Sequence, residues 1–324
     1  MRADKVLNVE DKEIHQAAMY ALDALLKAQY PNGAWPQRYE TFPDPEQFPV
    51  KQARYPKSWS RTYPEKRYFM LYTFNDGAIS DVIETMIEAY NTYGDKRFLE
   101  AAKRGGQFLI LAQMPDPQPA WAQQYNVDME PAWARWFEPP AITGGESFRV
   151  MGTLMGLYLE TGEQRYLEPI PRALAWAERS VLPDGHLARF YELETNRPLY
   201  FTPDRRMTYG DENLRPGYLF KVPGSRLKSI EAYYKRIRKQ GREAILRERR
   251  ERRDSKVAPE QSTGRPTTAV RAVIEALDVR GRWVEHGNLR DPENREKRIK
   301  ARVISCRTFN RNLTLLARYI KGNN

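Results

Sequence analysis

The sequence predicts an all-α fold: an (α/α) toroid, or incomplete α/α barrel, of repeated antiparallel helix pairs with long functional loops at one end. A helical stretch that ends in an aromatic, polar turn recurs in residues 17–39, 101–125 and 173–191. The helices that precede these turns also repeat, because residues 73–100 align with residues 142–168. Self-similarity at a period of roughly 65 to 85 residues indicates stacked supersecondary units.

A linear helical solenoid is the alternative arrangement of such helix pairs. The repeats are few and degenerate, and the loops that recur at one end are aromatic and charged rather than short. Both properties favour the toroid, in which inner and outer helices alternate around an axis. We therefore expect polar loops gathered at one end of an apolar helical frame.

The first expected helix covers residues 11–30, where apolar residues recur at helical spacing. It ends in a Tyr-Pro-Asn-Gly turn at residues 30–33, a sequence that stops helices. Residues 41–67 contain several prolines and mixed charges without a sustained period, which predicts a long surface loop. Loops of that length in compact domains usually bind something.

Two helix pairs follow, each closed by a short turn that contains a glycine. The first pair turns at Gly94 and the second at Gly162, and glycine is the usual residue just past a helix end. The four expected helices are residues 79–93, 98–112, 149–160 and 166–180. Because the segments between the pairs carry most of the tryptophans, the helices are expected to hold irregular aromatic loops.

The periodicity loosens in the C-terminal part of the chain. Residues 199–222 mix aromatic, turn and charged residues, a pattern that suits short strands. The remaining expected elements are a basic helix at residues 235–256, a polar linker at 258–266, and final helices at 268–278 and 304–320. We predict that residues 1–324 form one domain, with the basic helix and linker contained in residues 223–266.

Composition excludes several kinds of chemistry. Cys306 is the single cysteine, and His15, His186 and His286 have no zinc-ligand spacing, so disulfide, redox and zinc chemistry are not expected. No run of about 18 apolar residues is present, which argues against a membrane span. The N-terminal segment also lacks the apolar core of a signal peptide.

The net charge of +11 attracts polyanions, namely nucleic acids, anionic membranes or acidic polysaccharides. Much of the excess lies in residues 235–256, which we interpret as a solvated helix with i,i+4 ion pairs. The aromatic residues lie in loops remote from this helix, and no nucleic-acid-binding motif interleaves with it. We therefore expect neither a nucleic acid nor a membrane as the partner.

The loop motif TFNDGA, residues 73–78, places Asn75 and Asp76 just before a helix. Asn and Asp side chains often accept hydrogen bonds from the first helical amides, so one interpretation is a helix N-cap. The other is a calcium site, because Ca²⁺ prefers carboxylate and amide oxygens. The residues alone leave both interpretations open.

Two arginines lie at equivalent loop ends. Arg135 stacks on a neighbouring ring or pairs with Glu138 in a purely structural interpretation, and Arg189 likewise bridges to Glu192. In the functional interpretation the two guanidinium groups bind the carboxylates of a ligand through paired hydrogen bonds.

Three tryptophans, Trp35, Trp121 and Trp133, lie in the polar turns. They are either core aromatics or flat platforms for sugar rings. Their placement in polar turns favours exposure.

Four of these motifs together resemble one family. The segments TFNDGA, WAQQY, WARWFEPPAITGGES and LARFYELETNRP are similar to motifs of the family 10 polysaccharide lyases, the pectate lyases built on an (α/α) toroid. The resemblance covers residues 13–200 closely and the C-terminal helices more loosely. It implies calcium-dependent β-elimination in polygalacturonate, which cleaves α-1,4 linkages and leaves 4,5-unsaturated oligogalacturonates. In the family, calcium neutralises a uronate carboxylate, an arginine removes the C5 proton, and the glycosidic oxygen leaves C4.

The resemblance also implies roles for individual residues. Asp76 matches the family's calcium-binding aspartate, and Arg135 and Arg189 match arginines that contact the uronate chain. Asn75 and Trp121 are expected to bind substrate with them. Polygalacturonate or a related acidic polysaccharide is therefore the expected partner and Ca²⁺ the expected cofactor. We further expect a monomer with a secreted or periplasmic location.

Two features differ from the family pattern. The family has an earlier copy of its Asn-Asp motif that this chain does not contain, so its N-terminal helix pair is expected to be missing. The family's catalytic arginine lies in a Gly-Arg-Asp-Gly turn, where this chain has Pro203 before Asp204. Arg205 and Arg206 are the nearest arginines and are the predicted catalytic residues. The alternative function is that of a non-catalytic relative that binds acidic polysaccharides.

Overall fold

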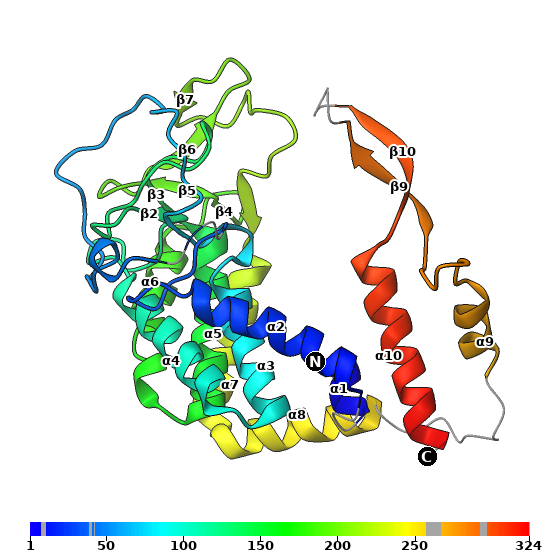
Figure 1. Cartoon of the computed structure of the whole chain (residues 1–324). Coiled ribbons are helices and arrows are strands. Elements are labelled where there is room, and N and C mark those ends of the chain that lie inside the picture. The colour runs from blue at the N-terminus through cyan, green and yellow to red at the C-terminus, as the bar shows by residue number, and fades with distance from the viewer. Residues whose placement is uncertain (8–10, 39–40, 42, 257–266, 292–296, 324) are drawn as a thin grey trace. The chain divides into compact units, whose positions relative to one another are not determined.

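The computed structural model describes residues 1–7, 11–38, 41, 43–256, 267–291 and 297–323. The chain divides into two compact units (Figure 1). The larger unit is Leu22–Glu251, and the smaller combines Met1–Ala21 with Arg252–Asn324. The single domain expected over residues 1–324 stays a prediction.

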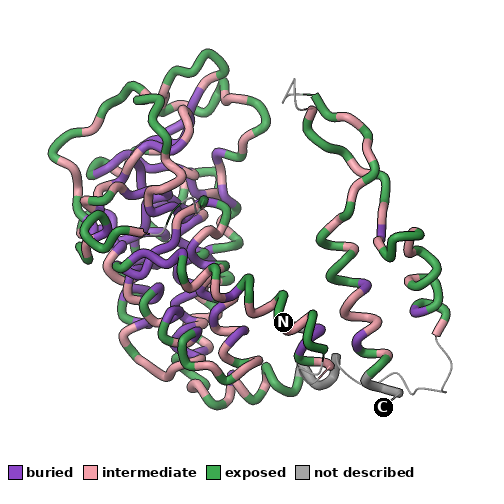
Figure 2. The backbone as a smooth tube through the Cα atoms, in the orientation of Figure 1, coloured by how far each residue is buried: buried purple, intermediate pink, exposed green. Residues whose placement is uncertain are grey.

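The larger unit is built around one buried helix. Its helices are α2 (Lys12–Ala28, from residue 22 onward), α3 (Ser80–Tyr93), α4 (Lys96–Leu111), α5 (Gly144–Thr161), α6 (Ile170–Arg179), α7 (Ser225–Gln240) and α8 (Arg242–Lys256), with short 3₁₀ turns η1 (Pro45–Gln47), η2 (Asn75–Gly77) and η3 (Gln164–Tyr166). Twelve of the eighteen residues of α5 are buried, so α5 is the central helix of the core. Figure 2 shows that buried residues concentrate in this unit.

Two adjacent glycines let the helices approach closely. A Cβ atom on Gly105 of α4 would lie 2.7 Å from the Ile83 side chain, and one on Gly106 would lie 2.5 Å from that of Leu157. These distances are shorter than van der Waals contact, so α4 can pack against α3 and α5 only because both positions lack a side chain.

The predicted all-α toroid is wrong, because the structure contains 47% helix and 13% strand, with several antiparallel sheets, and is therefore a mixed α and β structure. The strands β3 (Ala141–Thr143), β5 (Phe190–Glu192), β6 (Pro198–Phe201) and β7 (Met207–Thr208) form an antiparallel sheet in that order. Two further antiparallel pairs join β1 (Tyr72–Thr73) to β2 (Gln124–Tyr125) and β4 (His186–Ala188) to β8 (Lys221–Pro223). The loops are buried against the helices, and buried backbone groups need hydrogen-bond partners, which strand pairing supplies.

Most predicted helices are present with shifted ends. The turns at Gly94 and Gly162 have left-handed φ values of 73° and 77°, as expected of helix-ending glycines. Helix α5 begins five residues earlier than predicted. The expected basic helix is two helices, α7 and α8, separated at Gly241, whose φ of 79° breaks the helical path. The predicted linker at residues 258–266 lies outside the described residues.

The smaller unit contains α1 (Arg2–Val6), α9 (Thr268–Glu275), α10 (Cys306–Asn323) and a hairpin of β9 (Glu285–Arg290) and β10 (Arg298–Val303). The final two helices were predicted, but the hairpin was not. Within the part of the chain that the structure describes, no helix has the length and apolar character that a membrane span requires.

The recurring aromatic turn is held to the preceding helix by side-chain hydrogen bonds. In two of the recurring turns, the indole nitrogens of Trp35 and Trp121 donate to the backbone oxygens of Leu25 and Leu109, near the end of the preceding helix, each at 2.8 Å. Trp283, which lies outside the three copies of the repeat, makes the same kind of bond to the Val273 oxygen at 2.8 Å. Each ring therefore satisfies a carbonyl at a helix end, where intrahelical partners run out.

Tyrosines in the second and third copies of the turn act in a similar way. The Tyr125 hydroxyl donates to the Ala112 oxygen at 2.6 Å and accepts from the amide of Ala122 at 2.7 Å. The Tyr191 hydroxyl makes the matching pair of bonds with the Ser180 oxygen and the Ala188 amide. The repeat therefore fastens each loop to the end of a helix.

Candidate functional site

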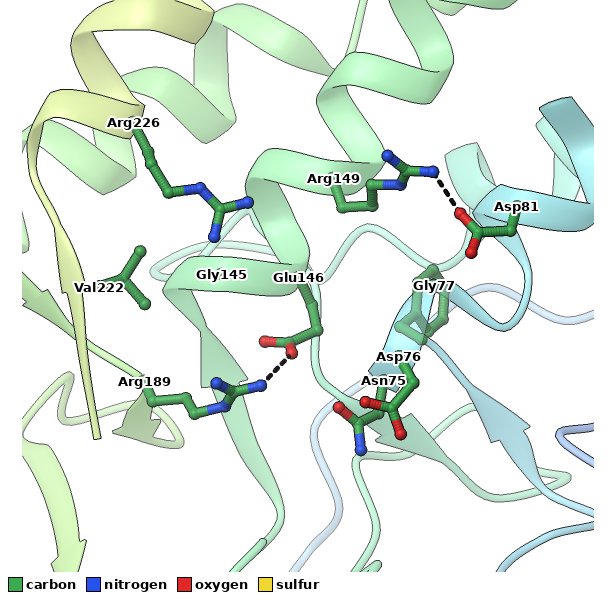
Figure 3. A pocket seen from close by; sticks show the side chains of 11 residues that line it. Asn75, Asp76, Gly77, Asp81, Gly145, Glu146, Arg149, Arg189, Val222 and Arg226 are labelled. Carbon is green, nitrogen blue, oxygen red and sulfur yellow. Dashed lines mark hydrogen bonds and ion pairs between the residues drawn. The ribbon is translucent and has the colours of Figure 1, made fainter. Parts of the chain in front are cut away.

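A cavity of about 350 Å³ opens at the start of the central helix α5 (Figure 3). Its lining comes from η2, α3, α5, the β4–β5 junction, β8 and α7. The lining residues are Phe74, Asn75, Asp76, Gly77, Asp81, Gly145, Glu146, Arg149, Arg189, Val222 and Arg226. Three carboxylates and three guanidinium groups therefore face one space.

Asp76 is held in an uncommon backbone conformation. Its φ is 54° and that of the following Gly77 is 72°, two left-handed residues in succession. Asp tolerates this region better than most residues, and observed strain of this kind is frequent at functional sites. The Asp76 side chain is exposed, so the turn presents a carboxylate at the cavity.

The N-cap interpretation of this motif does not hold. Helix α3 begins after Ile79, and no side chain caps it. The Asn75 side chain is buried and instead donates to Glu138 Oε1 at 3.4 Å. The motif therefore does not serve the helix that follows it.

Arg189 and Glu146 form an ion pair on the cavity wall, with Nη2 and Oε1 2.9 Å apart. The β3–β5 pairing places Arg189 against the first turn of α5, because the Gly144 amide donates to the Arg189 backbone oxygen at 3.3 Å. Glu146 Oε2 and Arg189 Nε are buried without a hydrogen-bond partner. Leaving a buried polar atom without a hydrogen-bond partner costs free energy, so these two atoms indicate that a ligand binds here.

A second group of residues, the Glu138 cluster (Asn75, Arg135, Glu138 and Tyr218), lies beside the cavity. The Glu138 side chain is fully buried and accepts from Arg135 Nε at 2.7 Å and from the Tyr218 hydroxyl at 3.1 Å. The Tyr218 ring also stacks under Arg189, whose guanidinium carbon lies 4.9 Å from the ring centroid. Tyr218 thus connects the two arginines predicted to contact substrate.

Electrostatics keep both of these arginines protonated. The hydrogen bond to Glu138 raises the pKa of Arg135 above its already high value. Burial is the largest single influence and lowers the pKa of Arg189, but Glu146, Tyr218 and Glu138 together outweigh it and the net change is upward. Both groups are therefore suited to binding carboxylates rather than to accepting a proton.

The remaining charges of the cavity differ in their pairing. Arg149 forms ion pairs with Asp81 and Glu84. Among the described residues, neither Asp76 nor Arg226 has an ion-pair or hydrogen-bond partner, and the Arg226 guanidinium carbon is 6.0 Å from the Phe148 ring centroid. Figure 3 shows Asp76 and Arg226 on different walls. The cavity thus presents one free carboxylate and one free guanidinium.

The expectation that Trp35, Trp121 and Trp133 are exposed platforms is wrong. Their exposed fractions are 1%, 0% and 9%. Trp35 and Trp121 fasten turns to helices, and the Trp133 indole donates to the Ser60 oxygen at 2.9 Å. Trp121 is enclosed in the core and has no face open to a sugar.

Arg205 and Arg206 lie in the turn between β6 and β7 and do not line the cavity. Arg206 pairs with Asp204 at 2.6 Å and its side chain is 80% exposed. Arg205 has a left-handed φ of 66°, and its guanidinium carbon is 5.4 Å from the Trp136 ring centroid. Their catalytic role stays a prediction.

The oxygen donors of the cavity suit a hard cation. Over the described ranges, no three His, Cys, Asp or Glu side chains gather as a ready metal cluster. Asp76, Asn75 and the unpaired Oε2 of Glu146 nevertheless supply carboxylate and amide oxygens, the ligands calcium takes. The donor chemistry therefore fits calcium, with the remaining ligands left to water and substrate.

Sequence reasoning missed several residues of the site. Glu146, Arg149 and Arg226 line the cavity, and Tyr218 supports Arg189, but none was predicted to have this role. Glu146 and Arg149 lie three residues apart on α5, about one helical turn. This spacing places both side chains on one face of the helix, so it would have indicated a shared site if the start of the helix had been predicted correctly. Tyr218 and Arg226 come from distant segments, and no local pattern marks them.

The comparisons with known proteins agree on one family. A family model described as pectic acid lyase matches residues 3–187, more than half of the chain. A family 10 polysaccharide lyase from Cellvibrio cellulosa is similar in structure, with a TM-score of 0.56 and 20% identity over 72% of this chain and 76% of that one. A point mutant of a family 10 polysaccharide lyase from Cellvibrio cellulosa, in complex with trigalacturonic acid, gives a TM-score of 0.54 and 22% identity over 73% and 77%. No curated protein matches the chain.

Proposed function

Because the chain belongs to the pectic acid lyase family and is a polysaccharide lyase, we propose that its cavity cleaves polygalacturonate by calcium-dependent β-elimination. The products are 4,5-unsaturated oligogalacturonates from α-1,4 linkages. One observation carries this proposal: the free carboxylate of Asp76 faces the same cavity as the guanidinium groups of Arg189 and Arg226. The similar lyase that was solved with trigalacturonic acid supports the choice of substrate.

The proposed reaction requires a uronate held with its carboxylate neutralised. In the elimination a base takes the C5 proton, the electron pair of the C5–H bond forms the C4–C5 double bond, and the C4–O bond breaks with its electron pair on the glycosidic oxygen, which then takes up a proton. Asp76 and Asn75 would hold calcium with Glu146 nearby, and the bound ion would withdraw charge from a uronate carboxylate. Arg189 would bind a carboxylate through its unpaired Nε and orient the ring.

The proton acceptor is the part of the reaction that the cavity does not supply by itself. Arg135 and Arg189 are kept protonated by Glu138 and Glu146, because each neighbouring carboxylate raises the pKa of its arginine. Arg205 and Arg206, the predicted bases, lie in the β6–β7 turn and are not among the residues that line the cavity.

The substrate proposal also bears on location. A polysaccharide is too large and too polar to cross a membrane unaided. A polymer-cleaving role therefore supports the predicted secreted or periplasmic location.

The proposal is tested by incubating the protein with polygalacturonate and calcium at alkaline pH and following the ultraviolet absorbance of unsaturated uronates. Absorbance is expected to rise with calcium and to stop when a chelator is added. A sample with fully methyl-esterified pectin serves as control, because esterification removes the carboxylates that Asp76-bound calcium and Arg189 would hold. A folded protein that binds polygalacturonate but releases no unsaturated product would refute the proposed activity.

A further inference from the structure

A second cavity, of about 290 Å³, shares two lining residues with the first, Arg149 and Arg226. Its other lining residues are Glu84, Phe148, Gly152, Ser225, Ser229 and Ile230. The two cavities therefore adjoin at the two arginines. None of the residues that are particular to the second cavity has a role in the proposed elimination.

The two cavities follow the same helix faces. On α5, Gly145 lines the first cavity, Arg149 lines both and Gly152 lines the second, at the i, i+4, i+7 spacing of one helix face. On α7, Arg226 lines both and Ile230, four residues later, lines the second. The open space thus extends along α5 and α7, a shape that suits a chain-like ligand.

The junction carries the charge that an acidic chain requires. Arg149 is already paired with Asp81 and Glu84, whereas Arg226 has no ionic partner among the described residues. Beyond it, Ser225 and Ser229 offer hydroxyl groups next to the apolar side chains of Phe148 and Ile230. A uronate ring presents a carboxylate, hydroxyl groups and apolar C–H faces, so this lining matches its chemistry.

We propose that the second cavity is a further uronate-binding subsite, in which Arg226 binds a carboxylate of the chain as it leaves the first cavity. The inference rests on the proposed function, since it assumes a uronate polymer in the first cavity. Arg226 is then a substrate-binding residue that holds the polymer in register, and it takes no part in proton transfer.

The first test fills the second cavity without changing a charge. In Gly152→Leu the new side chain points into it, and the nearest atom to the new Cβ is Ile230 Cδ1 at 4.0 Å, an ordinary contact. Gly156→Leu is the matched control, because it lies one turn further along α5, has the same intermediate exposure, lines neither cavity and has no atom within 4 Å of its Cβ. Both variants gain helix propensity equally.

The ligands are trigalacturonate and hexagalacturonate, titrated calorimetrically in chelator so that no turnover occurs. We expect wild type and Gly156→Leu to bind the hexamer about 10-fold more tightly than the trimer, which is the contribution of one charge-assisted hydrogen bond. Gly152→Leu is expected to lose this preference for length. A Gly152→Leu variant that keeps it, or a wild type that shows none, overturns the subsite.

The second test removes the charge at the junction. Arg226→Gln should weaken binding of the hexamer about 10-fold. Arg226→Lys should weaken it less, because the positive charge remains, but it should not match wild type, because lysine cannot make the paired hydrogen bonds of a guanidinium group. Arg238→Gln, an exposed arginine near the end of the same helix and outside both cavities, makes the same change in net charge and should have no effect. Equal weakening by Arg226→Gln and Arg238→Gln would mean that only net charge matters and would overturn the assignment.

The outcomes separate this inference from the proposed function. A wild type that releases no unsaturated product refutes the elimination, whatever its preference for length. A wild type that cleaves polygalacturonate while Gly152→Leu and Arg226→Gln behave like their controls refutes the subsite alone.

Discussion

The Glu138 cluster and the cavity beside it both contain carboxylates and arginines, but the charges of the cluster are all paired, whereas two charges of the cavity are not. In the cluster, the buried carboxylate of Glu138 is bound by Arg135, Tyr218 and Asn75. In the cavity, Asp76 and Arg226 have no partner among the described residues. The cluster is complete without a ligand, whereas the cavity is not.

The difference shows how arginines divide between structure and binding. A buried ion pair resists the loss of either partner, because the remaining charge is left without solvent or counter-charge. A free, solvated charge stabilises the fold little and is available to a ligand. Changes to Glu138, Arg135 or Tyr218 should therefore affect stability, and changes to Asp76 or Arg226 should affect activity, whereas Asn75 belongs to both groups.

The largest effect is expected from Glu138→Ala. This substitution leaves Arg135 and Tyr218 without their shared hydrogen-bond acceptor. We expect the unfolding free energy to fall by about 3 kcal/mol, the lower end of the range for a broken buried ion pair, because Arg135 is partly exposed. Urea denaturation measures it. The control is Glu243→Ala, which removes the surface ion pair between Glu243 and Arg242 and should lower the unfolding free energy by at most about 1 kcal/mol. Similar losses in both variants would contradict the contrast.

The next effect is expected from Asp76→Asn, which keeps the shape of the turn but removes the free carboxylate. With calcium present we expect kcat/KM on polygalacturonate to fall on the order of 100-fold, the equivalent of losing several kcal/mol of metal-based stabilisation. The urea midpoint should stay unchanged because the side chain is exposed and unpaired. An inactive variant that is also unfolded would contradict the division of roles.

Trp121→Phe sharpens the comparison by testing a structural residue that was predicted to bind substrate. The Leu109 oxygen loses its buried donor, so the unfolding free energy should fall by about 2 kcal/mol. Affinity for trigalacturonate, measured below the melting transition, should not change. A weaker affinity at unchanged stability would restore the sugar-platform interpretation.

A smaller effect is expected from acid. Burial raises the pKa of Glu138, but the hydrogen bonds and charge of Arg135 outweigh it, so the net pKa lies below the ordinary value. A carboxyl whose pKa is lower in the folded state stabilises the fold above its unfolded pKa, and this contribution is lost as the pH falls through the folded pKa. The stability gap between wild type and Glu138→Gln should therefore shrink from pH 7 to pH 3, and a constant gap would contradict this.

The smallest change in stability is expected from Arg206→Gln. Its pair with Asp204 is largely exposed, so the unfolding free energy should change by less than about 0.5 kcal/mol. The kcat of the same variant, and of Arg205→Gln, tests the catalytic prediction. Unchanged turnover in both would remove these arginines from the reaction.

The sequence was sufficient for the helical frame and for part of the site. Helix ends at Gly94 and Gly162 were predictable because a left-handed glycine is a local signal. Asp76 was identified from its motif, and the structure places it at the cavity.

Short strands were expected only in residues 199–222, where most of β6, β7 and β8 lie, whereas the other strands, the strand pairing and the cavity walls were beyond local patterns. The strands of the larger unit, two to four residues long, are too short to show alternation, and their pairing depends on segments far apart in the chain, as in β4 with β8. The exposure of Trp121 was misjudged for a related reason: the polar turn around it is folded back against the helix by the indole itself. Arg226 lies in a basic segment where nothing separates one arginine from another.

The aromatic turns give the loops a freedom that ordinary loops lack. Tyr125 and Tyr191 anchor each turn through ring hydroxyls and backbone atoms alone, so the identity of most intervening side chains is irrelevant to the anchor. The anchoring bonds therefore separate the attachment of these loops to the helices from the side chains that the loops present at the cavity.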